Sequence, residues 1–302
     1  MAEDTITNYL APETISHLTR LDLIARLVVE GFITGLHRSP YHGFSVEFSE
    51  HRPYIPGDPL RNIDWKALGK TNRLYTKQYE EETNLKSYLL LDLSGSMAYQ
   101  EGGSLSKFRY AACLTAALSY LMLRQRDAVG LMLFRDQPIS YVPPRSTQSH
   151  LQVLLKEIGH HTPQANTRMG PAFHNLAERL SRRGLVIICS DLFDDPTTVL
   201  NGLRHFRHQG HEVIVFHILD PRERDLEFKR ANTRFFDLEN PDTTLTTQPW
   251  HIQHEYRELM ADFISTYRRG CAEAKIDYVL LDTTVPFNLA LSHYLVRRRK
   301  LA

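Results

Sequence analysis

The sequence predicts an α/β protein built on a doubly wound, mainly parallel sheet. Short, almost continuously apolar runs at residues 88–91, 128–134, 185–190 and 212–219 have the length and composition of strands buried on both faces. Helix-like stretches separate these runs, which indicates right-handed crossovers between parallel strands. The sequence contains no repeat of solenoid period and no low-complexity segment, so nothing points to a different architecture.

The elements are expected in the following order. Residues 12–36 form an amphipathic helix, because apolar residues from Leu18 to Phe32 recur at spacings of three and four. Residues 38–73 mix basic, aromatic, Pro and Gly residues, which indicates an ordered arm packed on the main domain, with a short helix around 59–69. The sheet then adds strands at 139–142 and 276–281, and helices at 105–125, 147–159, 170–182, 196–209, 251–274 and 286–299.

This order divides the chain in two. Residues 1–80 comprise the N-terminal helix and the arm, and residues 81–302 comprise the main domain with a polar insertion at about 220–250. At 302 residues the chain is long enough to bury a substantial core.

Composition excludes several classes of function. A formal net charge of +1 gives no global field that would attract nucleic acid or an anionic membrane. Cys113, Cys189 and Cys271 are odd in number and far apart, as expected for buried thiols in a reducing compartment. The chain shows neither a signal-peptide pattern nor an apolar run of membrane-spanning length. We therefore expect a cytoplasmic protein with neither nucleic acid nor membrane as its partner.

Oxygen-bearing side chains follow two of the expected strands and precede one helix. Asp92, Ser94 and Ser96 come directly after the first buried strand, Thr167 lies in a loop before a helix, and Asp191 follows the strand at 185–190. Loops at the carboxyl ends of parallel strands meet at one edge of a sheet. Oxygen-only ligands suit a hard cation, so the pattern predicts a site for Mg²⁺ or Mn²⁺.

Each of the three loops also has a purely structural explanation, and the loop from Asp92 to Ser96 could be a tight polar turn that ends a strand. Asp92 and Thr167 are suitable helix caps, and Asp191 is a common type of turn residue. The combination of three loops in this chain order favours the metal site over three independent turns.

The five residues resemble the metal-ion-dependent adhesion site of von Willebrand factor A domains. The segments 43–48 (GFSVEF) and 51–66 (HRPYIPGDPLRNIDWK) are similar to the signature of the bacterial domain-of-unknown-function family 58. The resemblance implies a von Willebrand A-like domain over roughly residues 85–300 and a partner that is a MoxR-type AAA+ ATPase. In the arm, Arg61, Asp64 and Trp65 are candidates for a second contact surface.

We therefore expect a non-enzymatic, metal-dependent protein-interaction module, in which an acidic residue of the partner completes the coordination of the metal. Two alternatives stay open. One is a magnesium-dependent phosphoester hydrolase with Asp194 or Asp195 as its base. The other is a scaffold with a vestigial metal site.

The fifteen histidines suggest a further metal site less strongly. His205, His208 and His211 are three residues apart, and His251 and His254 lie near Glu255. Polar helix faces explain both groups more simply than metal binding does.

Overall fold

The computed structural model describes residues 12–38, 51–53, 68–69, 74–77, 86–164, 169–180, 183–228, 232–236, 238 and 243–301. Most of the expected arm, including Arg61, Asp64 and Trp65, therefore lies outside the described residues. In the arm, β1 (His51–Pro53) pairs antiparallel with β2 (Tyr75–Lys77), which directly follows the arm in the chain. Of the short helix expected at 59–69, only residues 68–69 are described, and they are helical. The packing of the arm on the main domain stays a prediction.

The centre of the protein is a six-stranded sheet with the order β10-β7-β6-β3-β4-β5. All neighbouring strands are parallel except β5, which runs antiparallel to β4 at the edge. This confirms the predicted mainly parallel α/β class. The strands are β3 (Lys86–Asp92), β4 (Ala128–Phe134), β5 (Pro138–Arg145), β6 (Leu185–Ser190), β7 (Glu212–Leu219) and β10 (Asp277–Asp282).

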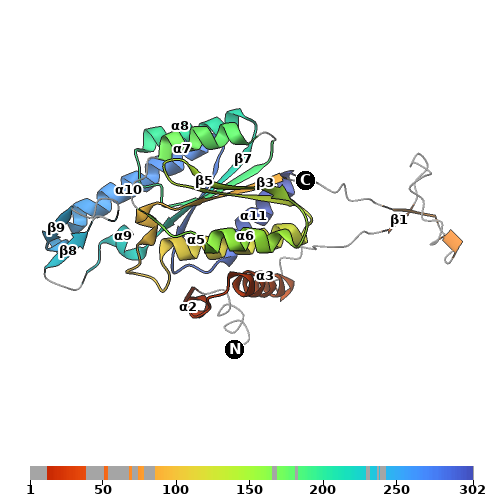
Figure 1. Ribbon diagram of the computed structural model, residues 1–302, viewed down its shortest axis with the longest axis horizontal. Helices are drawn as coiled ribbons and strands as arrows, with labels where there is room; N and C mark the ends of the chain where they lie inside the picture. The colour runs from red at the N-terminus through yellow and green to blue at the C-terminus, as the bar shows by residue number, and fades with distance from the viewer. Residues whose placement is uncertain are drawn as a thin grey trace.

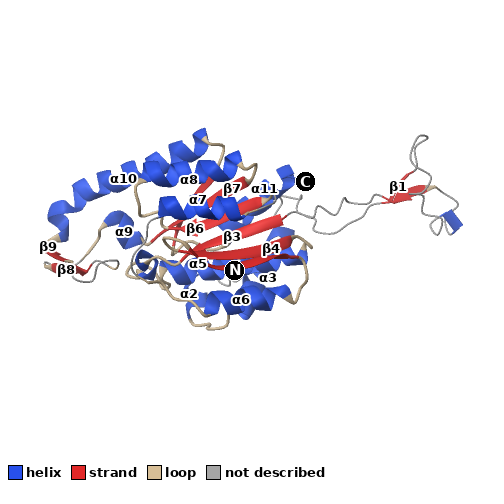
Figure 2. Cartoon of the chain, turned by 45° about the horizontal axis from the view of Figure 1, so that its top comes forward, coloured by secondary structure: helices blue, strands red, loops and turns tan. Residues whose placement is uncertain are grey.

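Helices cover both faces of the sheet (Figures 1 and 2). One face packs against α5 (Lys107–Arg124), α6 (His150–Gly159) and α11 (Asn288–Leu301), and α3 (Leu21–Arg38) packs on α5 on the side away from the sheet (Figure 1). The other face packs against α7 (Met169–Arg179), α8 (Pro196–His208) and α10 (Pro249–Glu273).

Alternation along each central strand divides the core into two layers. In β3, Leu89 and Leu91 point into the α5 layer, whereas Tyr88 and Leu90 point into the layer beneath α7 and α8. Because both faces are buried, these strands are apolar throughout, which is why they were predicted well from the sequence. Cys113, Cys189 and Cys271 are all buried free thiols, as expected.

The N-terminal helix expected at 12–36 is instead two helices, α2 (Pro12–Ser16) and α3. The chain turns between them, and the Arg109 guanidinium donates to the backbone carbonyls of Leu18 (2.8 Å) and Thr19 (3.1 Å). Arg20 adds a side-chain ion pair with Asp22 at the start of α3. The turn lets α3 lie along α5, where Ile24 and Phe32 join the main core.

The polar insertion contains regular structure that the sequence did not predict. It holds α9 (Pro221–Asp225), whose start is closed by a capping box between Asp220 and Glu223, and a hairpin of β8 (Thr233–Phe236) and β9 (Thr244–Thr247). The hairpin lies near the start of α10 (Figure 1). Within the described parts of the chain, no helix has both the length and the apolar character needed to span a membrane.

Candidate metal centre

The strand order places two aspartates at the topological switch point of the sheet, where the connections from neighbouring strands run in opposite directions. From β3 the chain proceeds to β4 on one side, and later returns to β6 on the other side of β3. Asp92 is the last residue of β3, and Asp191 directly follows β6. In open α/β sheets the ligand crevice lies outside the carboxyl ends of the two strands at such a switch point. Both aspartates are fully buried.

The loop after β3 gathers two hydroxyls beside Asp92. The backbone N–H of Ser94 donates to Asp92 Oδ1 at 2.7 Å, which folds the loop back onto the strand end. A short 3₁₀ helix, η3 (Gly95–Ala98), begins at once, and Met97 anchors it in the core. Its start brings Ser94 Oγ and Ser96 Oγ to 3.1 Å from each other. Asp92, Ser94 and Ser96 thus lie together in one loop at the end of β3, and their role as metal ligands stays a prediction.

Ser190 connects the Asp92 loop to the Asp191 loop. Its hydroxyl donates to Asp92 Oδ2 at 2.6 Å and accepts the backbone N–H of Leu192 at 2.9 Å. Leu192 is a buried residue in the left-handed region (φ 54°), a strained conformation for a branched side chain. The Tyr267 hydroxyl holds this turn by donating to the Leu192 carbonyl at 2.9 Å. Ser190 was not among the residues predicted from the sequence, although it is the last residue of a predicted buried strand.

Thr167, the fifth predicted ligand, lies outside the described residues. The chain on either side of it is described. Gln164 forms an isolated bridge with Ser94, and its N–H donates to the Leu93 carbonyl at 3.0 Å. Helix α7 starts at Met169. The assignment of Thr167 as a ligand therefore stays a prediction.

A buried ammonium lies next to the aspartates. Lys107, at the start of α5, is fully buried, and its Nζ lies 2.6 Å from both Asp191 Oδ2 and Glu223 Oε1. The ring of Phe193 covers the ammonium at 4.7 Å. Burial works to lower the pKa of Lys107, but the two carboxylates outweigh it and hold that pKa above its ordinary value. A lysine at the start of a helix is usually exposed to solvent, and Glu223 lies in the polar insertion. Neither residue was therefore predicted from the sequence to be part of the site.

Burial and like charge set the electrostatics of this cluster. Burial, followed by the charge of Asp191, raises the pKa of Asp92 to about 7, against the hydrogen bonds from Ser190 and Ser94. Burial also raises the pKa of Glu223 to about 7, although Lys107 opposes that shift. When all groups are ionised, three carboxylates face one ammonium, which leaves two negative charges. One divalent cation would neutralise them.

The donor set fits a hard cation better than a zinc-type ion. Among the described residues, no group of three His, Cys, Asp or Glu side chains is arranged to hold a metal. An ion here must therefore use the hydroxyls of Ser94 and Ser96 together with carboxylate oxygens, which is the ligand chemistry of Mg²⁺ or Mn²⁺.

The two acids considered as a general base have local structural roles. Asp195 caps α8, because its Oδ2 accepts the N–H and the hydroxyl of Thr198 at 2.9 and 2.6 Å. The Thr198 hydrogen bonds lower the pKa of Asp195, which weakens it as a base. Asp194 Oδ1 accepts the N–H of Asp195 at 2.7 Å.

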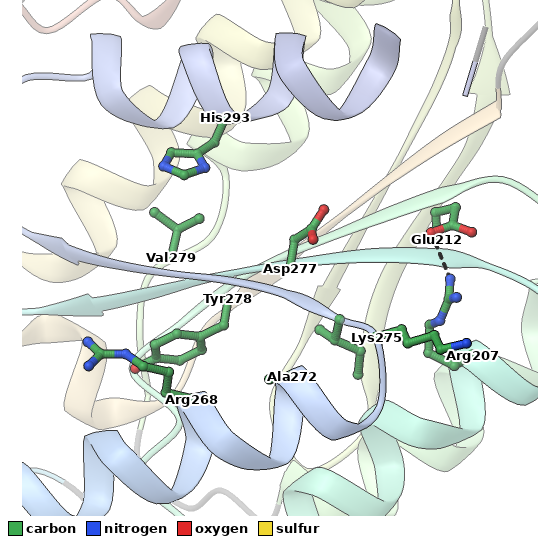
Figure 3. A pocket seen from close by; sticks show the side chains of 10 residues that line it. Arg207, Glu212, Arg268, Ala272, Lys275, Asp277, Tyr278, Val279 and His293 are labelled. Carbon is green, nitrogen blue, oxygen red and sulfur yellow. Dashed lines mark ion pairs between the residues drawn. The ribbon is translucent and has the colours of Figure 1, made fainter. Parts of the chain in front are cut away.

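A separate hollow of about 540 Å³ lies at the opposite edge of the sheet (Figure 3). Glu212 and Asp277, which begin β7 and β10, line it together with Arg268. Glu212 Oε2 is paired with Arg207 Nη1 at 2.8 Å. Because the hollow lies at the amino ends of the strands, it is not part of the Asp92–Asp191 site.

Comparison with known proteins gives the family. The model of the family "Protein of unknown function DUF58" matches residues 50–263, so the chain belongs to this family, as its arm motif indicated. A relative, the uncharacterized protein Rv1480 of Mycobacterium tuberculosis, is 27% identical over 219 residues, which cover 71% of this chain and 68% of the relative.

Solved structures that are similar to this chain include two from different sources. The protein BatB from Bacteroides thetaiotaomicron has a TM-score of 0.46 and 18% identity, covering 72% of this chain and 99% of its own. The VWA domain of SpRpn10 has a TM-score of 0.40 and 10% identity, covering 69% of this chain and 93% of its own.

Proposed function

We propose that this protein is a non-enzymatic, magnesium- or manganese-dependent protein-interaction module of the cytoplasm. Its partner in this proposal is a MoxR-type AAA+ ATPase, for which it acts as an adaptor. The observation that carries the proposal is the pair of fully buried aspartates, Asp92 and Asp191, joined through Ser190 at the switch point of the sheet. When both aspartates are ionised they place two negative charges at a buried strand end, and Lys107 supplies only one positive charge, so a further cation would favour the ionised state.

The ligand chemistry supports binding rather than catalysis. Serine hydroxyls are neutral, so they add no negative charge beyond that of the two aspartates and leave the metal electrophilic. Ser94, Ser96 and the two aspartates would hold the ion, and the ion would attract a carboxylate from outside the protein. A partner that presents an Asp or Glu would complete the coordination only when the ion is present. Asp195 is engaged as the cap of α8 and Asp194 Oδ1 accepts a backbone N–H, and these structural roles count against the hydrolase alternative.

Calorimetric titration of Mg²⁺ and Mn²⁺ tests the metal site. The wild-type protein is expected to bind one ion, and the variant Asp92→Asn is expected to bind none. Asp136→Asn is the matched control, because Asp136 is an exposed aspartate that follows β4 at the same edge of the sheet. Equal binding by wild type and Asp92→Asn would refute the site.

A pull-down with a MoxR-type ATPase tests the partner separately. Capture is expected in Mg²⁺, and is expected to be lost both in chelator and in the Asp92→Asn variant. Capture that survives in chelator would contradict the metal-dependent mode. Absence of capture in Mg²⁺, with metal binding intact, would reject this class of partner.

A further inference from the structure

Two histidines from neighbouring helices face each other away from the Asp92–Asp191 site. His174 lies on α7 and His205 on α8, and their Nδ1 atoms are 2.9 Å apart. The ring planes are inclined by 47°, with centroids 5.0 Å apart. The sequence grouped His205 with His208 and His211. In the structure His211 is instead buried against the ring of Tyr88.

The packing beneath the pair fixes its geometry. The residues next to these histidines in the chain, Phe173 and Phe206, are fully buried and meet edge to face with centroids 6.1 Å apart. Phe134 of β4 packs against Phe173 from the sheet at 5.4 Å. The spacing of α7 and α8 is therefore set by core contacts directly below the imidazoles, and the site is held on rigid elements.

A neighbouring amide is placed to select the tautomer of His205. The side-chain amide nitrogen of Gln209 lies 3.4 Å from His205 Nε2. The oxygen and nitrogen of such an amide are interchangeable by a flip. With its oxygen at this position, Gln209 accepts the Nε2–H of His205. The lone pair of His205 Nδ1 then points at His174, which is the usual outer-shell arrangement of a metal-bound histidine.

We propose that His174 and His205 form a binding site for a late first-row transition-metal ion, distinct from the hard-cation site and independent of it. Metal–nitrogen bonds near 2.0–2.1 Å make two nitrogens 2.9 Å apart subtend about 90° at the ion. That angle suits the square-planar or tetragonal coordination of Ni²⁺ and Cu²⁺ better than the tetrahedral coordination of Zn²⁺. Water fills the remaining positions, because the pair lies at the protein surface. A bound ion cross-links α7 to α8.

The test is a titration of Ni²⁺ into protein without a polyhistidine tag, in excess Mg²⁺ so that any hard-cation site is filled. One-to-one binding is expected, and His174→Asn and His205→Asn should each weaken it at least tenfold. Because chelation needs both rings, the double variant should be hardly weaker than either single variant. The same result is expected in an Asp92→Asn background, so failure of the magnesium proposal would leave this one standing.

Matched controls separate the site from binding by any surface histidine. His208→Asn changes an exposed histidine on the same helix, and it should leave Ni²⁺ affinity unchanged. Ni²⁺ should also raise the unfolding temperature of wild type and of His208→Asn, but not that of His174→Asn. A hydrogen-bonded imidazole pair that binds no metal would give equal Ni²⁺ affinity in wild type and His174→Asn, and that result would overturn the proposal.

Discussion

At the scale of single residues, the buried carboxylate of Asp92 lowers the free energy of unfolding of the metal-free protein, and the same carboxylate is a predicted metal ligand. Its pKa in the folded protein is about 7, well above the ordinary value of 3.8. Between these two pH values the folded protein keeps a proton on Asp92 that the unfolded chain has released. The metal-free protein therefore loses stability from this group as the pH rises from about 4 to about 7. A cation at the site would reverse that loss by stabilising the ionised form.

Replacement of Asp92 by Asn should therefore stabilise the metal-free protein while it removes the metal response. At pH 8 in chelator, we expect Asp92→Asn to raise the free energy of unfolding by roughly 1–3 kcal/mol, because the amide carries no buried charge. Urea denaturation with and without Mg²⁺ measures both effects, with Asp136→Asn as the control. A variant less stable than wild type in chelator at pH 8 would contradict this account.

His217 gives the opposite dependence on pH. Burial lowers its pKa to about 4, partly countered by Asp191, and its Nδ1 lies 2.6 Å from the Tyr278 hydroxyl. Between pH 6.5 and 4 the unfolded chain binds a proton that the folded protein does not bind, so stability falls as the pH falls through this window. At pH 5 the loss from this group is about 2 kcal/mol.

The variant His217→Phe isolates that contribution, because phenylalanine fills the same aromatic surroundings and does not titrate. Denaturation at pH 7.5 and pH 5 should show a smaller loss of stability in His217→Phe than in wild type. The same change with pH in both proteins would show that His217 does not contribute.

At the scale of elements, α9 is fastened to the candidate metal centre from two sides. Asp220 accepts the backbone N–H groups of Glu101 and Gly102, which fixes the loop that follows η3. Glu223 meets the ammonium of Lys107 on α5, and Lys107 also holds Asp191 after β6. The buried ammonium of Lys107 thus connects three segments that are far apart in the sequence, and the polar insertion forms part of the wall of the candidate metal centre.

Removal of the Lys107 ammonium should lower the free energy of unfolding substantially. Lys107→Met leaves Glu223 and Asp191 buried without their partner, so we expect a loss of roughly 3–5 kcal/mol in the free energy of unfolding. Addition of Glu223→Gln should recover part of that loss, and a double-mutant cycle in urea measures the coupling. Arg222 is on α9, as Glu223 is, and it forms an exposed ion pair with Glu101. Arg222→Gln breaks that pair and should lower the free energy of unfolding by less than about 1 kcal/mol. Equal losses in the free energy of unfolding for Lys107→Met and Arg222→Gln would argue against a special role of the Lys107 ammonium.

At the scale of the whole molecule, the sequence predicted the sheet better than the surroundings of the site. The strands at 185–190 and 212–219 were predicted to the residue, because burial on both faces makes them apolar throughout. The break between α2 and α3 was missed because Leu18 continues the helical spacing, while the contact that ends the helix comes from Arg109. Local patterns identified Asp92 and Asp191, but the contacts of Lys107 depend on tertiary structure.

The N-terminal helices belong to the same core as the sheet, and this has a consequence for truncation. Ile24, Val28, Val29 and Phe32 of α3 are buried in the cluster that contains α5 and β3. At about 1.5–3 kcal/mol for each buried side chain, the four contribute roughly 6–12 kcal/mol. That is comparable with the whole stability of an ordinary domain, about 5–15 kcal/mol.

A chain truncated to residues 81–302 should therefore expose the α3-facing side of α5 and fail to unfold cooperatively, although it retains every predicted metal ligand. Binding of a hydrophobic dye and the loss of a sharp thermal transition measure this directly. Within the intact chain, Phe32→Ala should cost about 3–5 kcal/mol, whereas Arg26→Ala, on the exposed side of the same helix, should change stability by less than about 0.5 kcal/mol. A truncated chain that unfolds cooperatively and binds Mg²⁺ as wild type does would show that the sheet and its remaining helices are self-sufficient, and that α3 serves another purpose.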